Sequence, residues 1–189
     1  MLGYLMATAV EFIFERLPAV LLAALIFTGI RWLLIRRGVL QRRSNFHEGA
    51  VVVFALYAAV VLSLTFLPLS SWKFWFSPNS SYYEFNSNLL AMLRGEYTTG
   101  RWGRTMLIAN VLLFVPLGFL APVLWRQKWW QTPLLALAAT LGIELIQPFF
   151  ARSFDVDDIF LNFAGGAIGL LLSAAPRALC SGLVSKVRE

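Results

Sequence analysis

Long runs of apolar residues, separated by short polar segments, dominate this chain. The first extends from Leu17 to Ile35 and the second from about Gly49 to Leu69. Three more follow, over about Thr105 to Trp125, Thr132 to Phe150 and Asp158 to Ala175. Each approaches the roughly 20 helical residues that cross a hydrocarbon layer about 30 Å thick. The pattern therefore predicts an all-α, polytopic transmembrane helix bundle of about five spans.

The composition supports a membrane protein over a water-soluble one. Of the 189 residues, 59% are hydrophobic and only 14% are charged, whereas soluble domains carry about 25% charged residues. Too little polar surface remains to cover a soluble globule. The length suits one bundle without a separate soluble domain, so we predict a single domain over residues 1–189.

The charge of the chain predicts its topology. A net charge of +6 would suggest nucleic acid as a partner of a soluble protein, but here the basic residues lie between apolar runs, where they set orientation. Nine fall in the segments predicted to face the cytoplasm: Arg36, Arg37, Arg42, Arg43, Arg126, Lys128, Arg177, Lys186 and Arg188. Six fall in the outer segments: Arg16, Lys73, Arg94, Arg101, Arg104 and Arg152. The bias predicts an outer N-terminus, an inner C-terminus and no nucleic-acid partner.

Four other features have simpler interpretations. Residues 1–14 lack a basic region and a cleavage site, which predicts an uncleaved interfacial or short hydrophobic helix. Residues 70–104 are rich in amphipathic aromatic side chains and are predicted to lie along the outer interface or to pack over the bundle. Cys180 is the only cysteine and has no acid or histidine beside it, so redox and metal chemistry are not indicated. His47 follows an arginine-rich segment and is expected to be solvated.

A polar cluster straddles the junction of the last two apolar runs. An ionisable residue costs about 2.5–3.5 kcal/mol at the centre of a membrane helix, so it needs a partner or a water-filled cavity. Glu144 and Gln147 are three residues apart and share one helical face. Asn110, in the third span, is expected to face the same region. After Gln147, five more polar residues belong to the cluster: Arg152, Asp155, Asp157, Asp158 and Asn162.

The last span carries a stripe that is acidic at its outer end and small at its inner end. Its members recur every three or four residues: Asp155, Asp158, Asn162, Gly165 and Gly169. Gly165 and Gly169, with Gly166 beside them, favour close helix packing because small residues let two backbones approach. In the third span, Pro116 and Gly118 are predicted to kink or thin the helix.

The acids of the cluster leave alternatives open. Asp155 could simply cap the last helix. Arg152 could neutralise Glu144 or Asp158 in a purely structural network. The functional interpretation is an outward-facing polar pocket that binds a cationic or phosphate-bearing ligand or performs acid/base chemistry. Glu144 is the best candidate acid or base, since partial burial suits a carboxylate to that work near neutral pH.

A divalent metal among Asp155, Asp157 and Asp158 is a minor alternative. The segment lacks a complete EF-hand loop. We therefore predict no metal site and no cofactor.

Three blocks carry a family resemblance. They are NVLLFVPLGFL from Asn110, IELIQ from Ile143 and RSFDVDDIFLNFAGGAIG from Arg152, all within residues 105–175. Together they resemble the VanZ-like family of small bacterial membrane proteins. The resemblance implies a multi-pass protein of the bacterial cytoplasmic (inner) membrane with a role in the cell envelope or in antibiotic resistance. The namesake of the family is associated with low-level resistance to teicoplanin.

Three functions remain open. The first is a membrane protein whose pocket binds an envelope lipid or an amphiphilic antibiotic through Asn110, Glu144, Gln147, Arg152, Asp155, Asp158 and Asn162. The second is an enzyme on a lipid-linked or phospholipid substrate, with Glu144 or Asp158 as acid/base and Arg152 on a phosphate. The third, a transporter, is disfavoured by five spans without a repeat.

Overall fold

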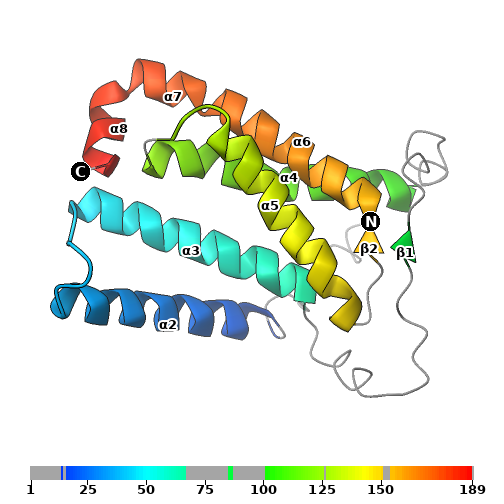
Figure 1. Cartoon of the computed structure of the whole chain (residues 1–189), viewed down its shortest axis with the longest axis horizontal. Coiled ribbons are helices and arrows are strands. Elements are labelled where there is room, and N and C mark those ends of the chain that lie inside the picture. Colours follow the sequence, from blue (N-terminus) through cyan, green and yellow to red (C-terminus); the bar gives the residue numbers. More distant parts are fainter. Residues whose placement is uncertain are drawn as a thin grey trace.

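A computed structural model describes residues 14, 16–66, 85–86, 101–125, 127–150 and 154–188. It has five long helices, and each one runs roughly opposite in direction to the one before it in the chain (Figure 1). They are α2 (Leu17–Arg36), α3 (Asn45–Phe66), α4 (Arg101–Leu124), α5 (Gln131–Ile146) and α6 (Val156–Leu172). Five helical stretches are long and apolar enough to cross a membrane. The predicted all-α bundle of five spans is confirmed.

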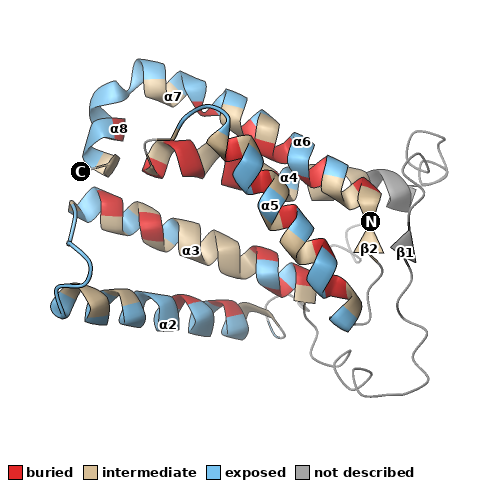
Figure 2. Cartoon of the chain, viewed as in Figure 1, coloured by how far each residue is buried: buried red, intermediate tan, exposed pale blue. Residues whose placement is uncertain are grey.

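The surface of the bundle is apolar while several polar side chains are buried. Exposed positions cover most of α2 and the outer faces of the other helices (Figure 2), and Leu25 is 70% and Leu171 is 75% exposed. Thr132 and Thr140, in contrast, are fully buried. Backbone groups in a hydrocarbon layer are satisfied within each helix, and large apolar side chains can then face lipid. This distribution is the one expected of a membrane bundle.

The closest helix contact joins α4 and α6. A methyl group at Gly165 would lie 2.0 Å from the carbonyl oxygen of Val111, and one at Gly169 would lie 2.1 Å from that of Val115. Real Cβ atoms do not approach this closely, so only glycine permits the contact. The small end of the predicted stripe therefore faces the backbone of α4.

Glycine is also needed on the α4 side of this seam. A methyl group at Gly118 would lie 1.9 Å from the carbonyl oxygen of Gly166, and one at Gly166 would lie 2.6 Å from the Cβ atom of Ala136 on α5. The α4 helix continues without a break through Pro116. Gly118 thus thins the helix where α6 crosses it.

Short elements complete the ends of the bundle. After α5, the 3-10 helix η3 (Gln147–Phe150) leads to strand β2 (Phe154–Asp155), which pairs in parallel with β1 (Phe85–Asn86). Pro148 explains the end of α5, since it lacks a backbone donor and its ring would clash with the carbonyl of Glu144 in a continuing α-helix. Helices α7 (Ala174–Leu179) and α8 (Ser181–Arg188) follow α6.

Helix α6 begins two residues earlier than predicted, at Val156 rather than Asp158. Asp155 is its N-cap, in an extended conformation, and accepts a hydrogen bond from the backbone N–H of Asp157 at 2.9 Å. Such a cap satisfies a donor that the first turn leaves without a helical partner. Asp155 therefore caps the last long helix, which is one of the alternatives that the sequence left open.

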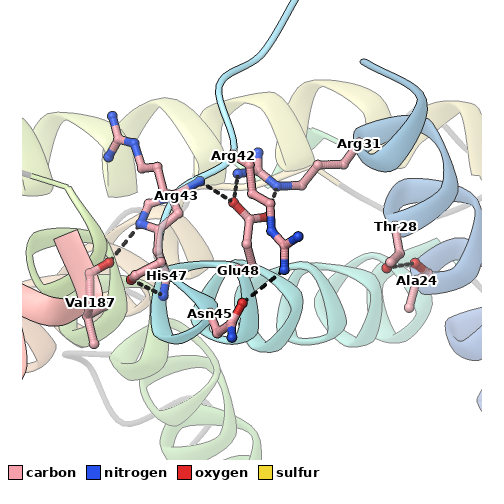
Figure 3. A network of polar contacts seen from close by, with 10 residues as sticks. Ala24, Thr28, Arg31, Arg42, Arg43, Asn45, His47, Glu48 and Val187 are labelled. Atoms are coloured by element: carbon pink, nitrogen blue, oxygen red, sulfur yellow. Dashed lines mark hydrogen bonds and ion pairs between the residues drawn. The ribbon is translucent and has the colours of Figure 1, made fainter. Parts of the chain in front are cut away.

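An ion pair links the first two spans. The guanidinium of Arg31 on α2 donates to both oxygens of Glu48 on α3, at 2.7 and 2.9 Å (Figure 3). Glu48 also accepts from the backbone N–H of Arg43 at 3.3 Å. A two-point contact of this kind fixes orientation as well as charge. It secures the α2–α3 hairpin at the end that carries the turn.

The expectation that His47 is solvated is wrong. The residue is 3% exposed, and its Nδ1 atom lies 2.7 Å from the carbonyl oxygen of Val187 on α8 (Figure 3). Ser44 donates to the carbonyl oxygen of Lys186 at 2.5 Å. Folding brings α8 back onto the start of α3, and this contact between residues far apart in sequence is what buries the histidine.

The predictions for the first residues and for the segment 70–104 lie largely outside the described residues. Residues 1–13 are outside them, and of the segment 70–104 only residues 85–86 and 101–104 are included. The interfacial position of that segment and the inner or outer location of the termini stay predictions.

Candidate functional site

The polar residues predicted from the sequence come from the end of the bundle where α5 passes into η3 and where α4 and α6 begin (Figure 1). This polar cluster comprises Asn110, Glu144, Gln147, Asp155, Asp157, Asp158 and Asn162. The pairing of β1 with β2 lies directly before α6. Five separate elements, α4, α5, η3, β2 and α6, therefore contribute to one region.

Glu144 is the most deeply buried acid of the cluster, at 1% exposure. Its carboxylate accepts a hydrogen bond from the backbone N–H of Asp155 at 2.9 Å. The amide of Gln147 lies 3.0 and 3.1 Å from the two carboxylate oxygens. Because a carboxylate only accepts, we assign the amide with its nitrogen toward Glu144. The turn from α5 through η3 to β2 thus closes around this side chain.

Asp158 has a partner on another helix. The amide nitrogen of Asn110 on α4 donates to the carboxylate of Asp158 on α6. Asp157 is 4% exposed. All four acids of the cluster engage in polar contacts. Within the described ranges, no three His, Cys, Asp or Glu side chains converge as ligands of a metal ion.

Asn162 is buried with one unused acceptor. Its side chain is 5% exposed, and its amide nitrogen donates to the hydroxyl of Thr140 on α5 at 3.0 Å. Its Oδ1 atom is buried without a hydrogen-bond partner among the described atoms. Leaving such an atom unpaired costs about 1–3 kcal/mol. Asn162 lies one helical turn below Asp158, so this acceptor extends the polar cluster into the bundle.

The structure brings most of the predicted residues into three groups of contacts. Glu144 meets Gln147 and Asp155, Asn110 meets Asp158, and Asn162 meets Thr140. Arg152 lies outside the described residues. Its predicted pairing with Glu144 or Asp158 therefore stays a prediction.

Thr140 is a polar residue of this region that the sequence interpretation missed. The buried residues of α5 recur every four positions, and Thr140 lies one turn from Glu144 on the same face. That spacing is a usable signal. Threonine is common in apolar helices, however, because its hydroxyl can bond to its own backbone, and the hydrophobic pattern alone therefore assigns Thr140 to the apolar run.

An apolar groove lies between α3, α4 and α5, and none of its lining residues belongs to the polar cluster. Its cavity volume is about 320 Å³. The hydroxyl of Tyr57 is its main polar group and donates to the carbonyl oxygen of Leu113 at 2.8 Å. We call this cavity the α3–α5 groove. It is lined by Phe54, Tyr57, Ala58, Val61, Leu62, Phe66, Phe114, Leu117, Ala138, Ala139, Gly142, Ile143 and Ile146.

A comparison with protein families shows which family the chain belongs to. The model of the family described as VanZ/LLP1 matches residues 54–177, which is more than half of the sequence. The chain belongs to the VanZ-like family. The predicted resemblance is thereby confirmed, and the structure describes a VanZ-like membrane protein. A search of curated proteins and one of solved structures each found no match.

The VanZ-like match begins within α3 and ends within α7. It includes every residue of the polar cluster and of the α3–α5 groove. The ion pair of Arg31 and Glu48 and the whole of α8 lie outside it. The organisation of residues 1–189 as one VanZ-like domain stays a prediction.

Proposed function

We propose that this VanZ-like protein binds an amphiphilic lipid of the cell envelope at the outer face of the bacterial cytoplasmic membrane. The polar headgroup contacts the polar cluster, and one hydrocarbon chain lies in the α3–α5 groove. The observation that carries the proposal is a hydrocarbon-lined groove of about 320 Å³ whose lining residues Ile143 and Ile146 flank the buried acceptor Glu144 in the sequence of α5. The buried acceptor on Asn162 adds to the polar cluster.

The chemistry of the cluster favours a headgroup that donates hydrogen bonds. Carboxylates only accept, and the Oδ1 atom of Asn162 is a further acceptor. An ammonium group or sugar hydroxyls supply the matching donors. Arg152, if it faces the cluster as predicted, adds a cation for a phosphate. An amphiphile with a cationic portion fits this set, and an amphiphilic antibiotic or envelope precursor of that kind would contribute to glycopeptide resistance or envelope maintenance.

Native mass spectrometry in mild detergent with added dioleoyl phosphatidylethanolamine tests the proposal. We expect Glu144→Gln to lower lipid retention about tenfold, because a charge-assisted hydrogen bond contributes about 1.5–3 kcal/mol. Asp158→Asn should weaken retention in the same direction. Equal retention by the wild type and both variants would rule out the headgroup assignment.

Two substitutions on α5, one inside the groove and one outside it, test whether the lipid chain binds there. Ala139 lines the groove, whereas Leu145 is 62% exposed and lies outside it. Ala139→Phe fills the cavity and should reduce lipid retention severalfold, while Leu145→Phe should leave it unchanged. A similar loss in both variants would contradict binding in the groove.

A lipid-modifying enzyme is the alternative function. It is favoured by Glu144, a buried carboxylate held by a backbone N–H at 2.9 Å, and it would use Glu144 or Asp158 as acid/base on a lipid-linked or phospholipid substrate. Mass spectrometry of envelope lipids from cells with the protein, with Glu144→Gln and without the protein separates the two functions. A modified lipid that depends on Glu144 would establish the enzyme, and unchanged lipids would favour the binder.

A further inference from the structure

The opposite end of the bundle is strongly basic. There α2 passes into α3, α4 passes toward α5, and the chain ends in α8 (Figure 1). Within the described residues, Glu48 is the one acid at this end, and it is paired with Arg31. The other described cations here are Arg36, Arg37, Arg42, Arg43, Lys128, Arg177, Lys186 and Arg188. This basic end attracts anions.

A cavity of about 460 Å³ lies within this basic end. It is lined by Arg43 from the α2–α3 turn, Leu124 and Trp125 from the end of α4, and Arg188 from α8. We call it the basic pocket. Two guanidinium groups thus share a cavity with two apolar side chains at the end of a membrane span.

Backbone contacts fix both arginines at the pocket. Arg188 donates to the carbonyl oxygens of Pro122 and Val123, at 2.6 and 3.3 Å, and so caps the C-terminus of α4. Arg43 donates to the carbonyl oxygen of Arg188 at 3.2 Å. These contacts hold the two guanidinium groups in place at the pocket.

The α8 helix is itself held by neighbouring side chains. Ser44 donates to the carbonyl oxygen of Lys186. His47 bonds to the carbonyl oxygen of Val187 (Figure 3). Together with Arg43, they satisfy the last three carbonyl groups of α8, which have no helical partners. The pocket is therefore built by the fold, from three segments far apart in sequence.

We propose that the basic pocket binds the headgroup phosphate of an anionic phospholipid. Guanidinium groups match phosphate oxygens in geometry and charge. Leu124 and Trp125 favour a lipid over a free anion, because tryptophan and the ends of apolar spans lie at the level of the headgroups. Basic pockets between membrane helices on the cytoplasmic side bind such headgroups. This site is separate from the polar cluster, which lies at the other end of the bundle.

Native mass spectrometry with added dioleoyl phosphatidylglycerol tests the site, with dioleoyl phosphatidylcholine as the neutral comparison. Arg43→Gln should lower phosphatidylglycerol retention about fivefold, as expected for one cation near a lipid surface. Phosphatidylcholine retention should not change. Arg43→Lys, which keeps the charge, should retain more phosphatidylglycerol than Arg43→Gln.

Arg37→Gln is the matched control, because Arg37 is exposed at the same end and does not line the pocket. Equal losses of phosphatidylglycerol retention in Arg37→Gln and Arg43→Gln would contradict the pocket. They would show that the lipid is held only by a general attraction to the basic end. Displacement of phosphatidylglycerol by inorganic phosphate at millimolar concentration would show a free-anion site and overturn the lipid assignment. Arg43→Gln keeps the α4 cap made by Arg188, and size-exclusion chromatography checks that the variant remains folded.

Discussion

At the scale of single residues, the informative positions are polar side chains buried in an apolar bundle. Asn162 and Thr140 bond across α5 and α6, yet Asn162 keeps an unused acceptor among the described atoms. A buried acceptor stays without a hydrogen bond when the surrounding helices fix its position, or it receives its hydrogen bond from a ligand. The sequence predicted Asn162 by its place on the acidic stripe, but it offered no way to identify Thr140 as the partner.

The bond between Asn162 and Thr140 can be measured by a double-mutant cycle. Thr140→Val, Asn162→Ala and the double variant, unfolded in mixed micelles, should give a coupling energy of about 0.6 kcal/mol, the average for hydrogen bonds between membrane helices, and at most about 1.7 kcal/mol. A coupling energy of zero would mean that the bond contributes nothing to stability.

At the scale of helices, the α4–α6 seam sets how closely the elements approach. The sequence predicted glycine packing on α6 and a thinned α4, but it did not show which backbone each glycine meets. Gly165 and Gly169 face carbonyl groups of α4, whereas Gly166 faces α5. Neighbouring glycines on one helix thus serve two different contacts, because successive residues lie about 100° apart around the axis.

Gly169→Ala should destabilise the protein by about 1–3 kcal/mol, since the added methyl group forces α4 and α6 apart. Gly29→Ala is the matched control on α2, where nothing lies within 4 Å of the new methyl group. It should stabilise the helix by about 0.5–1 kcal/mol. Thermal unfolding in detergent compares the two, and equal stabilities would contradict the tight seam.

At the scale of the whole molecule, the two ends of the bundle differ in charge. One end carries the buried acids of the polar cluster, and the other carries the basic pocket. The distribution of basic residues predicts that the basic end faces the cytoplasm. The headgroup proposal for the polar cluster and the phosphate proposal for the basic pocket then concern opposite leaflets.

The single cysteine offers a test of this topology. Cys180 is exposed between α7 and α8, at the basic end. A membrane-impermeant maleimide should label it in permeabilised cells but not in intact cells. Cys180→Ser combined with Ser80→Cys, in the segment predicted to lie outside, should be labelled in intact cells as well. Labelling of Cys180 in intact cells would invert the predicted topology.

The sequence by itself determined the number of spans, the family and the main members of the polar cluster. These depend on local properties, namely the length of apolar runs, the helical spacing of polar residues and short motifs. Tertiary structure decided which residues meet: Asn110 with Asp158, His47 with Val187, and Arg43 with Arg188. It also formed the α3–α5 groove and the basic pocket, since a cavity exists only between helices whose crossing is set by packing over the whole bundle.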